Sequence, residues 1–506
     1  MRQLHTPLEA ARWLQTQVTG TLRTDSRKLQ PGDGFLAWPG AAVDARAHVA
    51  AALAAGAAAC LVEQDGADAF GLADPRIACY RGLKAASGPL ASHYFGEPSQ
   101  ALRLLAVTGT NGKTSTAWWL AQALSKLKQS THIPCGFVGT LGIGVPPEVV
   151  STGLTTPDPV ALQAALAGFV AQGLHACAME ASSIGIEERR MDGAHIHTAL
   201  LTNLTQDHLD YHGNMEAYWQ AKTRLFAWPG LCAAVINVDD PYGAELEQNL
   251  ATRAQQGALD LWTVSMQAGP GNRARLQAQG IDYSGGGVRF DLVEGGQSVP
   301  LATQLMGDYN VSNLLGVIAA MRTLGVPLAA ATEACSALTP VPGRMECVSV
   351  PGQPLVAVDY AHTPDALAKA LDALKPVAAQ RGGQLWCVFG CGGDRDTSKR
   401  PLMGVMAAGH AERVMVTSDN PRSESPDAII SQILLGLVGA PQVMVEPDRA
   451  RAIANVLAQA APADVVLVAG KGHEDYQEIA GKRLPFSDMA QVRLALAQRA
   501  GGGATV

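Results

Sequence analysis

Short apolar runs alternate with helix-like segments along the central part of the chain. The runs cover residues 102–107, 176–180, 198–203 and 233–237, and a helix-like segment spans 116–127. Runs of this length between polar turns are typical of buried strands. Strands that alternate with helices predict a parallel sheet covered by helices on both faces.

The same alternation returns nearer the C-terminus with a further feature. Apolar runs at 355–358, 385–389, 414–417 and 465–468 each end in a polar, charged loop. In open parallel sheets, ligands bind outside the carboxyl ends of the strands. A single loop of this kind would be ordinary surface, but four together predict one shared crevice.

Proline and glycine interrupt the pattern at two places and suggest three domains. Pro98 and Ser99 stand before the first central run, and Pro340, Pro342 and Gly343 precede the C-terminal one. Between them, the glycine-rich stretch 267–300 has short alternating pieces that predict hairpins. We expect an α/β protein with a small α/β N-terminal domain, a central domain with a P-loop-type parallel sheet, and a Rossmann-like C-terminal domain. The predicted boundaries are 1–97, 98–338 and 339–506.

The strongest chemical signal follows the first central run, where a glycine loop leads into a helix. Backbone N–H groups and the helix dipole at such a turn bind phosphates, Lys113 can reach the terminal phosphates, and Thr114 can hold Mg²⁺. The strict phosphate-loop pattern has glycine where this chain has Val107, so the loop is a shortened variant. The alternative is a plain strand-to-helix turn with an incidental lysine. The predicted ATP-binding loop consists of Gly109, Thr110, Asn111, Gly112, Lys113, Thr114 and Ser115.

Acidic and imidazole side chains follow the next two runs. Glu180 ends one run and can bind Mg²⁺ directly or through water, although such a glutamate is often only a neighbour of a helix cap. The loop 203–213 carries two histidines and two aspartates. Zinc would need a third nitrogen or sulfur ligand, so a hard-cation site beside phosphates fits better. The helix-like segment 218–226 carries Lys222, to which the residue pattern alone gives no special role.

Composition narrows the class of protein. The 506 residues are 47% hydrophobic and 16% charged, with a formal net charge of −7 and no basic run, so nucleic acid is a poor partner. No secretory signal or membrane-spanning stretch is visible, which predicts a cytoplasmic protein without membrane insertion. The nine cysteines include no Cys-x-x-Cys pair. Reduced thiols explain them better than a disulfide or zinc framework.

Several motifs together resemble the Mur ligases, ATP-dependent enzymes that form amide bonds in peptidoglycan precursor synthesis. They are Gly-Thr-Asn-Gly-Lys-Thr at 109–114, Glu-x-Ser-Ser at 180–183, Asp-His-Leu-Asp-Tyr-His-Gly at 207–213, Ala-Lys-x-x-Leu-Phe at 221–226, Gly-Asp-Tyr-Asn-Val-Ser-Asn at 307–313 and Gly-Arg-Met-Glu at 343–346. The resemblance covers nearly the whole chain. It departs from the common pattern at Ser115, Ile184 and Glu188.

The loop at 419–422 indicates which amino acid such a ligase adds. Asp-Asn-Pro-Arg is similar to the motif of family members that add diaminopimelate, which has a second carboxylate that lysine lacks. A guanidinium fork matches that carboxylate with two charge-assisted hydrogen bonds, and Glu474 can take the distal ammonium. Taken alone, Arg422 could be a surface ion pair. The resemblance thus implies that ATP drives addition of meso-2,6-diaminopimelate to UDP-N-acetylmuramoyl-L-alanyl-D-glutamate (UDP-MurNAc-L-Ala-D-Glu) through an acyl phosphate.

The resemblance also implies a role for individual residues. It implies that the catalytic residues are Lys113, Glu180, His208 and Lys222, with Lys222 present as N6-carboxylysine. It implies that Mg²⁺ is bound by Thr114, Glu180, His208 and Lys222. Asn310, Arg344 and Asp359 join the ATP-binding loop. The residues expected to bind the uridine-linked precursor are Thr24, Ser26, Thr155, Thr156, Ser182, Glu188 and Arg190. Those expected to bind diaminopimelate are Arg395, Asp419, Asn420, Pro421, Arg422, Gly470 and Glu474.

Three other functions remain open at this stage. A ligase of this kind could add L-lysine or a dipeptide, and folate polyglutamylation shares the general architecture. A nucleotide-dependent binding module without turnover is the third. We expect a monomer in which the second and third domains must close to react, because ATP and the amino acid would bind to different domains.

Overall fold

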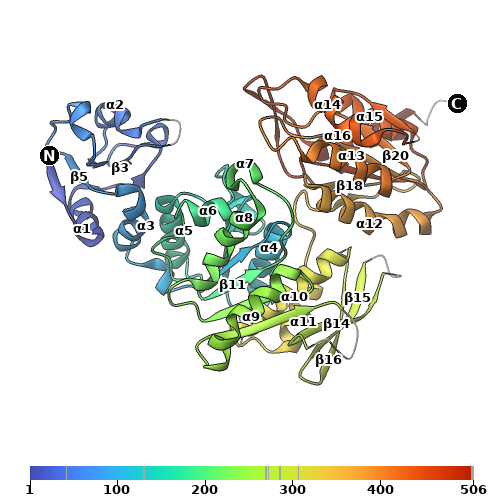
Figure 1. Ribbon diagram of the computed structural model, residues 1–506, viewed down its shortest axis with the longest axis horizontal. Coiled ribbons are helices and arrows are strands. Elements are labelled where there is room, and N and C mark those ends of the chain that lie inside the picture. The colour runs from blue at the N-terminus through green and yellow to red at the C-terminus, as the bar shows by residue number, and fades with distance from the viewer. Residues whose placement is uncertain are drawn as a thin grey trace.

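The computed structural model describes residues 1–40, 43–128, 131–267, 271, 273–283, 287–305, 307–440 and 442–502. Figure 1 shows three lobes, with the N-terminal lobe at one end, the central lobe in the middle and the C-terminal lobe at the other end. No helix among the described residues is both long and apolar enough to cross a membrane.

The N-terminal lobe is built on a five-stranded parallel sheet in the order β1-β5-β4-β3-β2. Its strands are β1 (Arg2–Leu4), β2 (Leu22–Arg23), β3 (Gly34–Ala37), β4 (Ala59–Glu63) and β5 (Ile77–Tyr80), and its helices are α1 (Pro7–Gln17), α2 (Val49–Ala54) and α3 (Leu83–Tyr94). Thr6 caps α1 by accepting a hydrogen bond from the N–H of Glu9, and Pro7 begins the helix. These residue types therefore fix where α1 begins.

The central lobe contains an eleven-stranded sheet in the order β16-β15-β14-β13-β12-β11-β6-β10-β7-β8-β9, parallel from β14 to β7 and antiparallel at both ends. Its strands are β6 (Arg103–Thr108), β7 (Cys135–Gly139), β8 (Gly142–Val145), β9 (Glu148–Val150), β10 (Ala176–Glu180), β11 (Thr198–Leu201), β12 (Ala233–Asn237), β13 (Asp260–Ser265), β14 (Leu276–Asp282), β15 (Val288–Glu294) and β16 (Gln297–Thr303). The predicted parallel sheet and hairpins are confirmed.

Strand β20 (Arg413–Val416) ends one residue before the predicted end of its run, and β11 ends two residues before the predicted end of its run. We expected β11 to reach residue 203, but it ends at Leu201. The side chains of Thr202 and Asn203 instead donate hydrogen bonds to the carbonyl of Asn111, at 2.6 and 3.0 Å. These two residues therefore support the glycine loop rather than extend the strand.

Helices cover both faces of the central sheet, as predicted. One buried core packs the sheet against α4, α10 and α11, and another packs it against α5, α8 and α9. The helices of this lobe are α4 (Lys113–Lys126), α5 (Pro159–Ala171), α6 (Ser183–Glu187), α7 (Leu209–His212), α8 (Met215–Thr223), α9 (Pro241–Gln255), α10 (Asp308–Thr323) and α11 (Leu328–Ser336). Helix α4 begins three residues earlier than predicted, directly at the end of the glycine loop.

The C-terminal lobe has a six-stranded sheet in the order β17-β18-β22-β19-β20-β21, in which only β17 is antiparallel to its neighbour. The strands are β17 (Glu346–Val348), β18 (Leu355–Asp359), β19 (Leu385–Phe389), β20 (Arg413–Val416), β21 (Val443–Val445) and β22 (Val465–Ala469). The four predicted polar loops follow β18, β19, β20 and β22, which lie side by side in parallel. Their loops therefore meet at one edge of the sheet, where the shared crevice is predicted.

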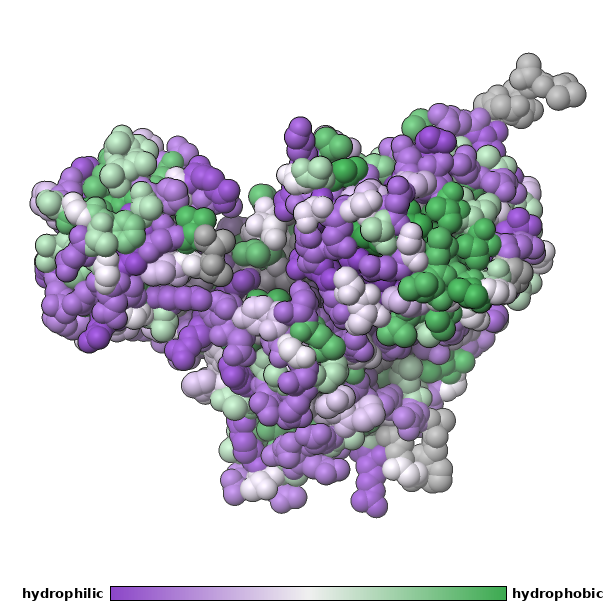
Figure 2. All heavy atoms as spheres, turned by 45° about the horizontal axis from the view of Figure 1, so that its top comes forward, coloured by the Kyte–Doolittle hydropathy of each residue, from purple (hydrophilic) through white to green (hydrophobic). Residues whose placement is uncertain are grey.

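Helices cover this sheet on both faces as well. They are α12 (Pro364–Arg381), α13 (Lys399–His410), α14 (Pro426–Leu434), α15 (Arg449–Gln459) and α16 (Asp488–Gly502), with a hairpin of β23 (Tyr476–Ile479) and β24 (Lys482–Pro485) beside them. Figure 2 shows a mostly hydrophilic surface on which apolar side chains gather over the C-terminal lobe. Exposed apolar residues of that lobe include Leu402, Val405, Leu435 and Val438.

Candidate active site

The glycine loop is wedged between the end of β11 and helix α10. Gly109 has φ +139°, and a Cβ built on it would lie 1.9 Å from Oγ1 of Thr202. Gly112 has φ +84°, and a Cβ there would lie 2.4 Å from Oδ1 of Asn313. Both positions need glycine because the backbone is left-handed and has no room for a side chain. The loop is therefore held in one shape by its neighbours.

Gly112→Ala is expected to destabilise the protein measurably. The left-handed backbone costs an L-residue about 1–2 kcal/mol, and contact with Asn313 adds to this. Gly173→Ala is the matched control, because Gly173 has φ +77° and no atom within 4 Å of an added Cβ. Thermal and urea unfolding of both variants should show the larger loss of stability for Gly112→Ala. Equal losses would contradict the packing argument.

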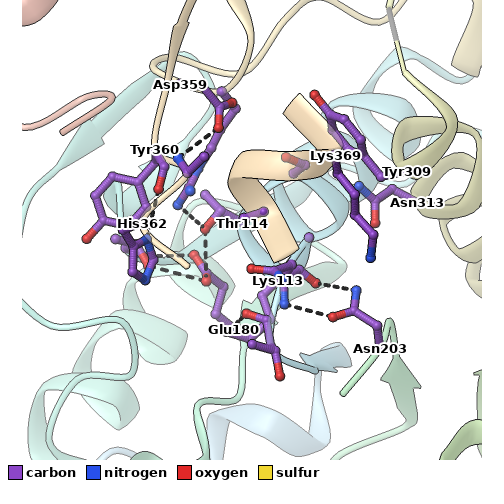
Figure 3. A pocket seen from close by; sticks show the side chains of 18 of the residues that line it. Lys113, Thr114, Glu180, Asn203, Tyr309, Asn313, Asp359, Tyr360, His362 and Lys369 are labelled. Atoms are coloured by element: carbon purple, nitrogen blue, oxygen red, sulfur yellow. Dashed lines mark hydrogen bonds between the residues drawn. The ribbon is translucent and has the colours of Figure 1, made fainter. Parts of the chain in front are cut away.

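Lys113 and Thr114 begin helix α4 and point toward Glu180 at the end of β10 (Figure 3). The ammonium of Lys113 donates to the carbonyls of Gly109 and Thr110, at 2.9 and 2.8 Å. Burial lowers the pKa of Lys113, although the charges of Glu180 and Asp207 act against that shift. A cation therefore stands at the mouth of the phosphate loop.

The hydroxyl of Thr114 donates to Oε2 of Glu180 at 3.0 Å and accepts a hydrogen bond from Nη2 of Arg344 at 3.1 Å. Oε1 of Glu180 accepts from the N–H of Thr140 at 2.8 Å. Among the described residues, no group of three or more His, Cys, Asp or Glu side chains is placed to hold a metal. One carboxylate beside one hydroxyl fits Mg²⁺, which keeps several waters and completes its shell with substrate phosphates.

Lys222 lies buried behind the phosphate loop, with 1% of its surface exposed. Its ammonium donates to the carbonyl of Gly109 at 2.7 Å and stands 4.4 Å from the centre of the Tyr218 ring. Burial and the neighbouring charge of Lys113 lower the pKa of Lys222 well below its usual value. A lysine on a helix is ordinarily solvated. The residue pattern alone therefore gave no reason to expect Lys222 to be buried at the phosphate loop.

Asp207 joins the central and C-terminal lobes. Its Oδ2 lies 3.5 Å from Nε2 of His208 and 3.8 Å from Nε2 of His362. Burial alone would raise the pKa of Asp207, but the two imidazoles hold it well below its usual range. Burial also lowers the pKa of His208 to about 4, so its ring is neutral near pH 7. The residue pattern placed Asp207 in a loop that fits a hard-cation site, but it could not pair Asp207 with His362, because their two loops lie far apart along the chain.

The predicted nucleotide residues line two adjoining cavities between the central and C-terminal lobes. One, of about 200 Å³, is lined by the loop from Thr110 to Ser115 together with Glu180, His208, Asn310, Arg344 and Asp359. The other, of about 810 Å³, shares Asn310 and Arg344 with it. Asp359 accepts hydrogen bonds from the N–H groups of Met345 and Ala361, at 2.6 and 2.8 Å, while burial raises its pKa. Gly109 and Lys222 lie behind this lining.

The predicted precursor-binding residues form one group in the central lobe and a separate pair in the N-terminal lobe. Thr156 is bonded to Ser182, at 3.0 Å between the hydroxyls, and its carbonyl accepts from Nη1 of Arg190 at 3.0 Å. Glu188 binds Lys84 of helix α3 at 2.6 Å. Thr155 contacts Thr140, at 3.0 Å between their hydroxyls. Within the described part of the chain, no hydrogen bond joins Thr24 or Ser26 to this group.

The predicted amino-acid residues lie on the loops after β19, β20 and β22. Oε2 of Glu474 accepts from Nδ2 of Asn420 at 2.8 Å and from Nζ of Lys471 at 2.7 Å. Arg422 has φ +52°, donates from Nη1 to the carbonyl of Gly393 at 2.6 Å, and donates its N–H to the carbonyl of Glu478 at 2.9 Å. Lys471 is fully buried and was missed, although it lies in the polar loop predicted after the apolar run 465–468.

Three more of these predicted residues occupy the same edge, and one stands apart. A Cβ on Gly470 would lie 2.4 Å from Oδ2 of Asp419, so the loops that carry these two residues are in contact. Pro421, in the same loop as Asp419, is also buried. Arg395 is half exposed and reaches toward α7 instead, where its Nη1 lies 3.9 Å from Oδ2 of Asp210. The structure thus gathers Asp419 to Arg422, Gly470 and Glu474, while Arg395 faces the central lobe.

Comparison with known proteins identifies the family. Residues 107–321 match the Mur ligase middle domain, and residues 343–472 match the Mur ligase glutamate ligase domain. The chain is 63% identical to the UDP-N-acetylmuramoyl-L-alanyl-D-glutamate–2,6-diaminopimelate ligase of Acidovorax sp. (strain JS42), over 99% of this chain and 100% of that protein. The chain belongs to the Mur ligase family. A Pseudomonas aeruginosa Mur ligase of the same name is 47% identical over 94% of each chain.

Solved structures of Mur ligases share the fold. A UDP-N-acetylmuramoyl-L-alanyl-D-glutamate–2,6-diaminopimelate ligase is 37% identical, covers 95% of each chain and superposes with a TM-score of 0.63. The MurF ligase of Thermotoga maritima, determined with ADP, is 18% identical over 97% of this chain and 99% of that chain, with a TM-score of 0.66. At this lower identity the likeness shows the fold alone.

Proposed function

We propose that this Mur ligase is an ATP-dependent acid–amino-acid ligase that joins meso-2,6-diaminopimelate to the D-glutamate of UDP-N-acetylmuramoyl-L-alanyl-D-glutamate. The observation that carries the proposal is the meeting of the phosphate loop with the C-terminal lobe. Arg344 reaches Thr114 at 3.1 Å, and Nδ2 of Asn111 reaches Oδ2 of Asp365 at 3.0 Å. The names of the relatives support the choice of substrates.

The proposed reaction has two chemical steps. The D-glutamate carboxylate attacks the γ-phosphorus of ATP, the bond to ADP breaks, and an acyl phosphate forms. The amine of diaminopimelate then attacks the acyl carbon, loses a proton and displaces phosphate. Both partners of the first step are anions, so Lys113 and Arg344 lower its barrier by offsetting their repulsion. Bound between Thr114 and Glu180, Mg²⁺ would add charge neutralisation at the phosphates.

We propose that Lys222 carries N6-carboxylation, with His208 beside it on the metal side of the loop. The neutral amine attacks CO₂, forms a carbamate and releases a proton. Burial favours the neutral amine, which supports this chemistry. The carbamate would place carboxylate-like oxygens where a hard cation prefers them, and the ammonium would cease to repel it.

Specificity for diaminopimelate would come from the loops at the edge of the C-terminal sheet. Arg422 supplies a guanidinium for the distal carboxylate, and Glu474 supplies a carboxylate for the distal ammonium. Thr155, Thr156, Ser182, Glu188 and Arg190 would hold the peptide part of the precursor, and Thr24 and Ser26 its uridine nucleotide. Asn310 and Asp359 would bind the ATP side, and Arg395 would complete the amino-acid site. Asp419, Asn420, Pro421 and Gly470 would form its walls.

The domain boundaries of 1–97, 98–338 and 339–506 are proposed on the basis of the three sheets, each of which falls within one range. We also propose that the enzyme is a monomer that acts in the cytoplasm. The net charge of −7 supports small-molecule partners over nucleic acid.

Amino-acid-dependent phosphate release tests the function. With ATP, Mg²⁺ and the uridine-linked dipeptide present, meso-diaminopimelate should release phosphate and L-lysine should support little release. Preference for L-lysine or a dipeptide would change the substrate but keep the ligase. Release with a folate and glutamate instead would favour polyglutamylation, and absence of release with every substrate would favour a binding module.

A further inference from the structure

One arginine lies buried beneath the loops that carry the proposed amino-acid site. Arg449 begins helix α15, and none of its side chain is exposed. Nη1 donates to the carbonyl of Ser418 at 3.2 Å, and Nη2 donates to the carbonyl of Ala469 at 2.8 Å. Ser418 directly precedes Asp419, and Ala469 directly precedes Gly470. One guanidinium thus binds the backbone at the roots of both loops.

Other contacts between these two loops come from side chains of the loops themselves: Nζ of Lys471 donates to Oδ1 of Asn420 at 3.1 Å, and Nδ2 of Asn420 donates to Oε2 of Glu474 at 2.8 Å. Strand β19 lies between β20 and β22, so the loops that follow the outer two strands are not joined by a backbone ladder. The guanidinium of Arg449 spans this gap beneath the end of β19. Because a Cβ on Gly470 would lie 2.4 Å from Oδ2 of Asp419, small changes in the separation alter the pocket wall.

A second buried residue fixes the guanidinium. Asp488, at the start of helix α16, accepts from Nε at 2.7 Å and from Nη2 at 2.7 Å, and its side chain is also unexposed. This paired geometry orients a planar guanidinium in one plane. Buried ion pairs contribute little net stability in general, so their placement is better explained by what they position. In Arg449, the hydrogen bonds that do not go to Asp488 go to the carbonyls of Ser418 and Ala469, at the bases of the two loops.

We propose that Arg449 is a positioning residue, which holds the loops after β20 and β22 at a fixed separation and thereby shapes the amino-acid pocket. Which amino acid binds in this pocket rests on the proposed function. The role of Arg449 in holding the two loops does not depend on it. Lysine cannot replace the arginine here, because a single ammonium cannot span Asp488 and both carbonyls with the geometry of the fork.

Arg449→Lys tests the proposal, and Arg322→Lys is the matched control. Arg322 also forms a paired bridge, to Glu294 at 2.9 and 3.0 Å, and donates to the carbonyl of Val326 at 2.6 Å, but it lies in the central lobe. The first measurement is hydrogen exchange of the backbone amides in 417–422 and 469–474. Exchange should increase in both segments for Arg449→Lys and in neither for Arg322→Lys.

The second measurement separates KM from kcat. Arg449→Lys should raise KM for the amino acid about 10-fold or more, since a small misplacement of binding groups can cost up to about 100-fold. KM for ATP should stay within about twofold, because the phosphate loop lies on another lobe. Arg322→Lys should leave KM for the amino acid unchanged.

The outcomes are distinguishable from failure of the proposed function. If the unmodified enzyme does not turn over diaminopimelate, the proposed substrate is wrong, and hydrogen exchange still decides whether Arg449 braces the loops. Unchanged exchange and unchanged KM for the amino acid in folded Arg449→Lys would overturn the proposal. Should that variant not fold, Asp488→Asn keeps the shape of the acid and should raise exchange in the same two segments; no increase there would also overturn it.

Discussion

Replacing Lys222 with alanine should lower turnover by about 10²–10³-fold or more, the size of effect seen when one preorganised group at a charged transition state is lost. Lys222 is the buried amine behind the phosphate loop, hydrogen-bonded to the carbonyl of Gly109 at 2.7 Å. The substitution removes both that contact and the site of proposed carboxylation. Phosphate release at saturating substrates measures the loss.

Two comparisons separate this chemistry from a packing defect. Lys222→Met keeps most of the buried volume but no amine, so it should be as inactive as Lys222→Ala while unfolding at a higher temperature. Lys126→Ala, on the exposed end of α4, should keep full activity. Excess bicarbonate should restore neither Lys222 variant, because carboxylation needs the amine. A fully active Lys222→Ala enzyme would refute the proposed role.

Most of the strand pattern could be predicted from the sequence because buried parallel strands are continuous apolar runs. Strands β10, β12 and β19 have the predicted bounds, 176–180, 233–237 and 385–389. Strand β11 differs because Thr202 and Asn203 bond to the phosphate loop, and a contact between distant segments leaves no mark on local periodicity. The sequence could therefore place the elements but not every end.

The same distinction applies to the site. Lys113, Thr114 and Glu180 could be found because a glycine loop and a strand end are local signals. The burial of Lys222 could not, because it depends on helix α8 packing under a loop more than 100 residues away in sequence. Lys471 and Arg449 were missed for the same reason. Each is fully buried among polar groups that only the folded C-terminal sheet brings together.

The position of Arg422 leads to the second large expected effect. Its backbone is fixed at φ +52° by a hydrogen bond to the carbonyl of Glu478 at 2.9 Å. Its side chain leans over Gly393, at 2.6 Å from the carbonyl, at the edge where Asn420 and Glu474 meet. The guanidinium therefore lies at the same edge of the sheet as the carboxylate proposed to take the distal ammonium of the substrate.

Arg422→Ala should raise KM for meso-diaminopimelate by about 10–100-fold, since a hydrogen bond to a charged group contributes about 1.5–3 kcal/mol. KM for L-lysine should change little, because lysine has no distal carboxylate, so the preference between the two amino acids should shrink by the same factor. Arg451→Ala, whose side chain is 72% exposed and pairs with Glu446, is the control and should keep both values. Phosphate release with each amino acid measures them. An unchanged preference in folded Arg422→Ala would mean that another group holds the distal carboxylate, because a guanidinium that selects this end of the substrate cannot be removed without loss of discrimination.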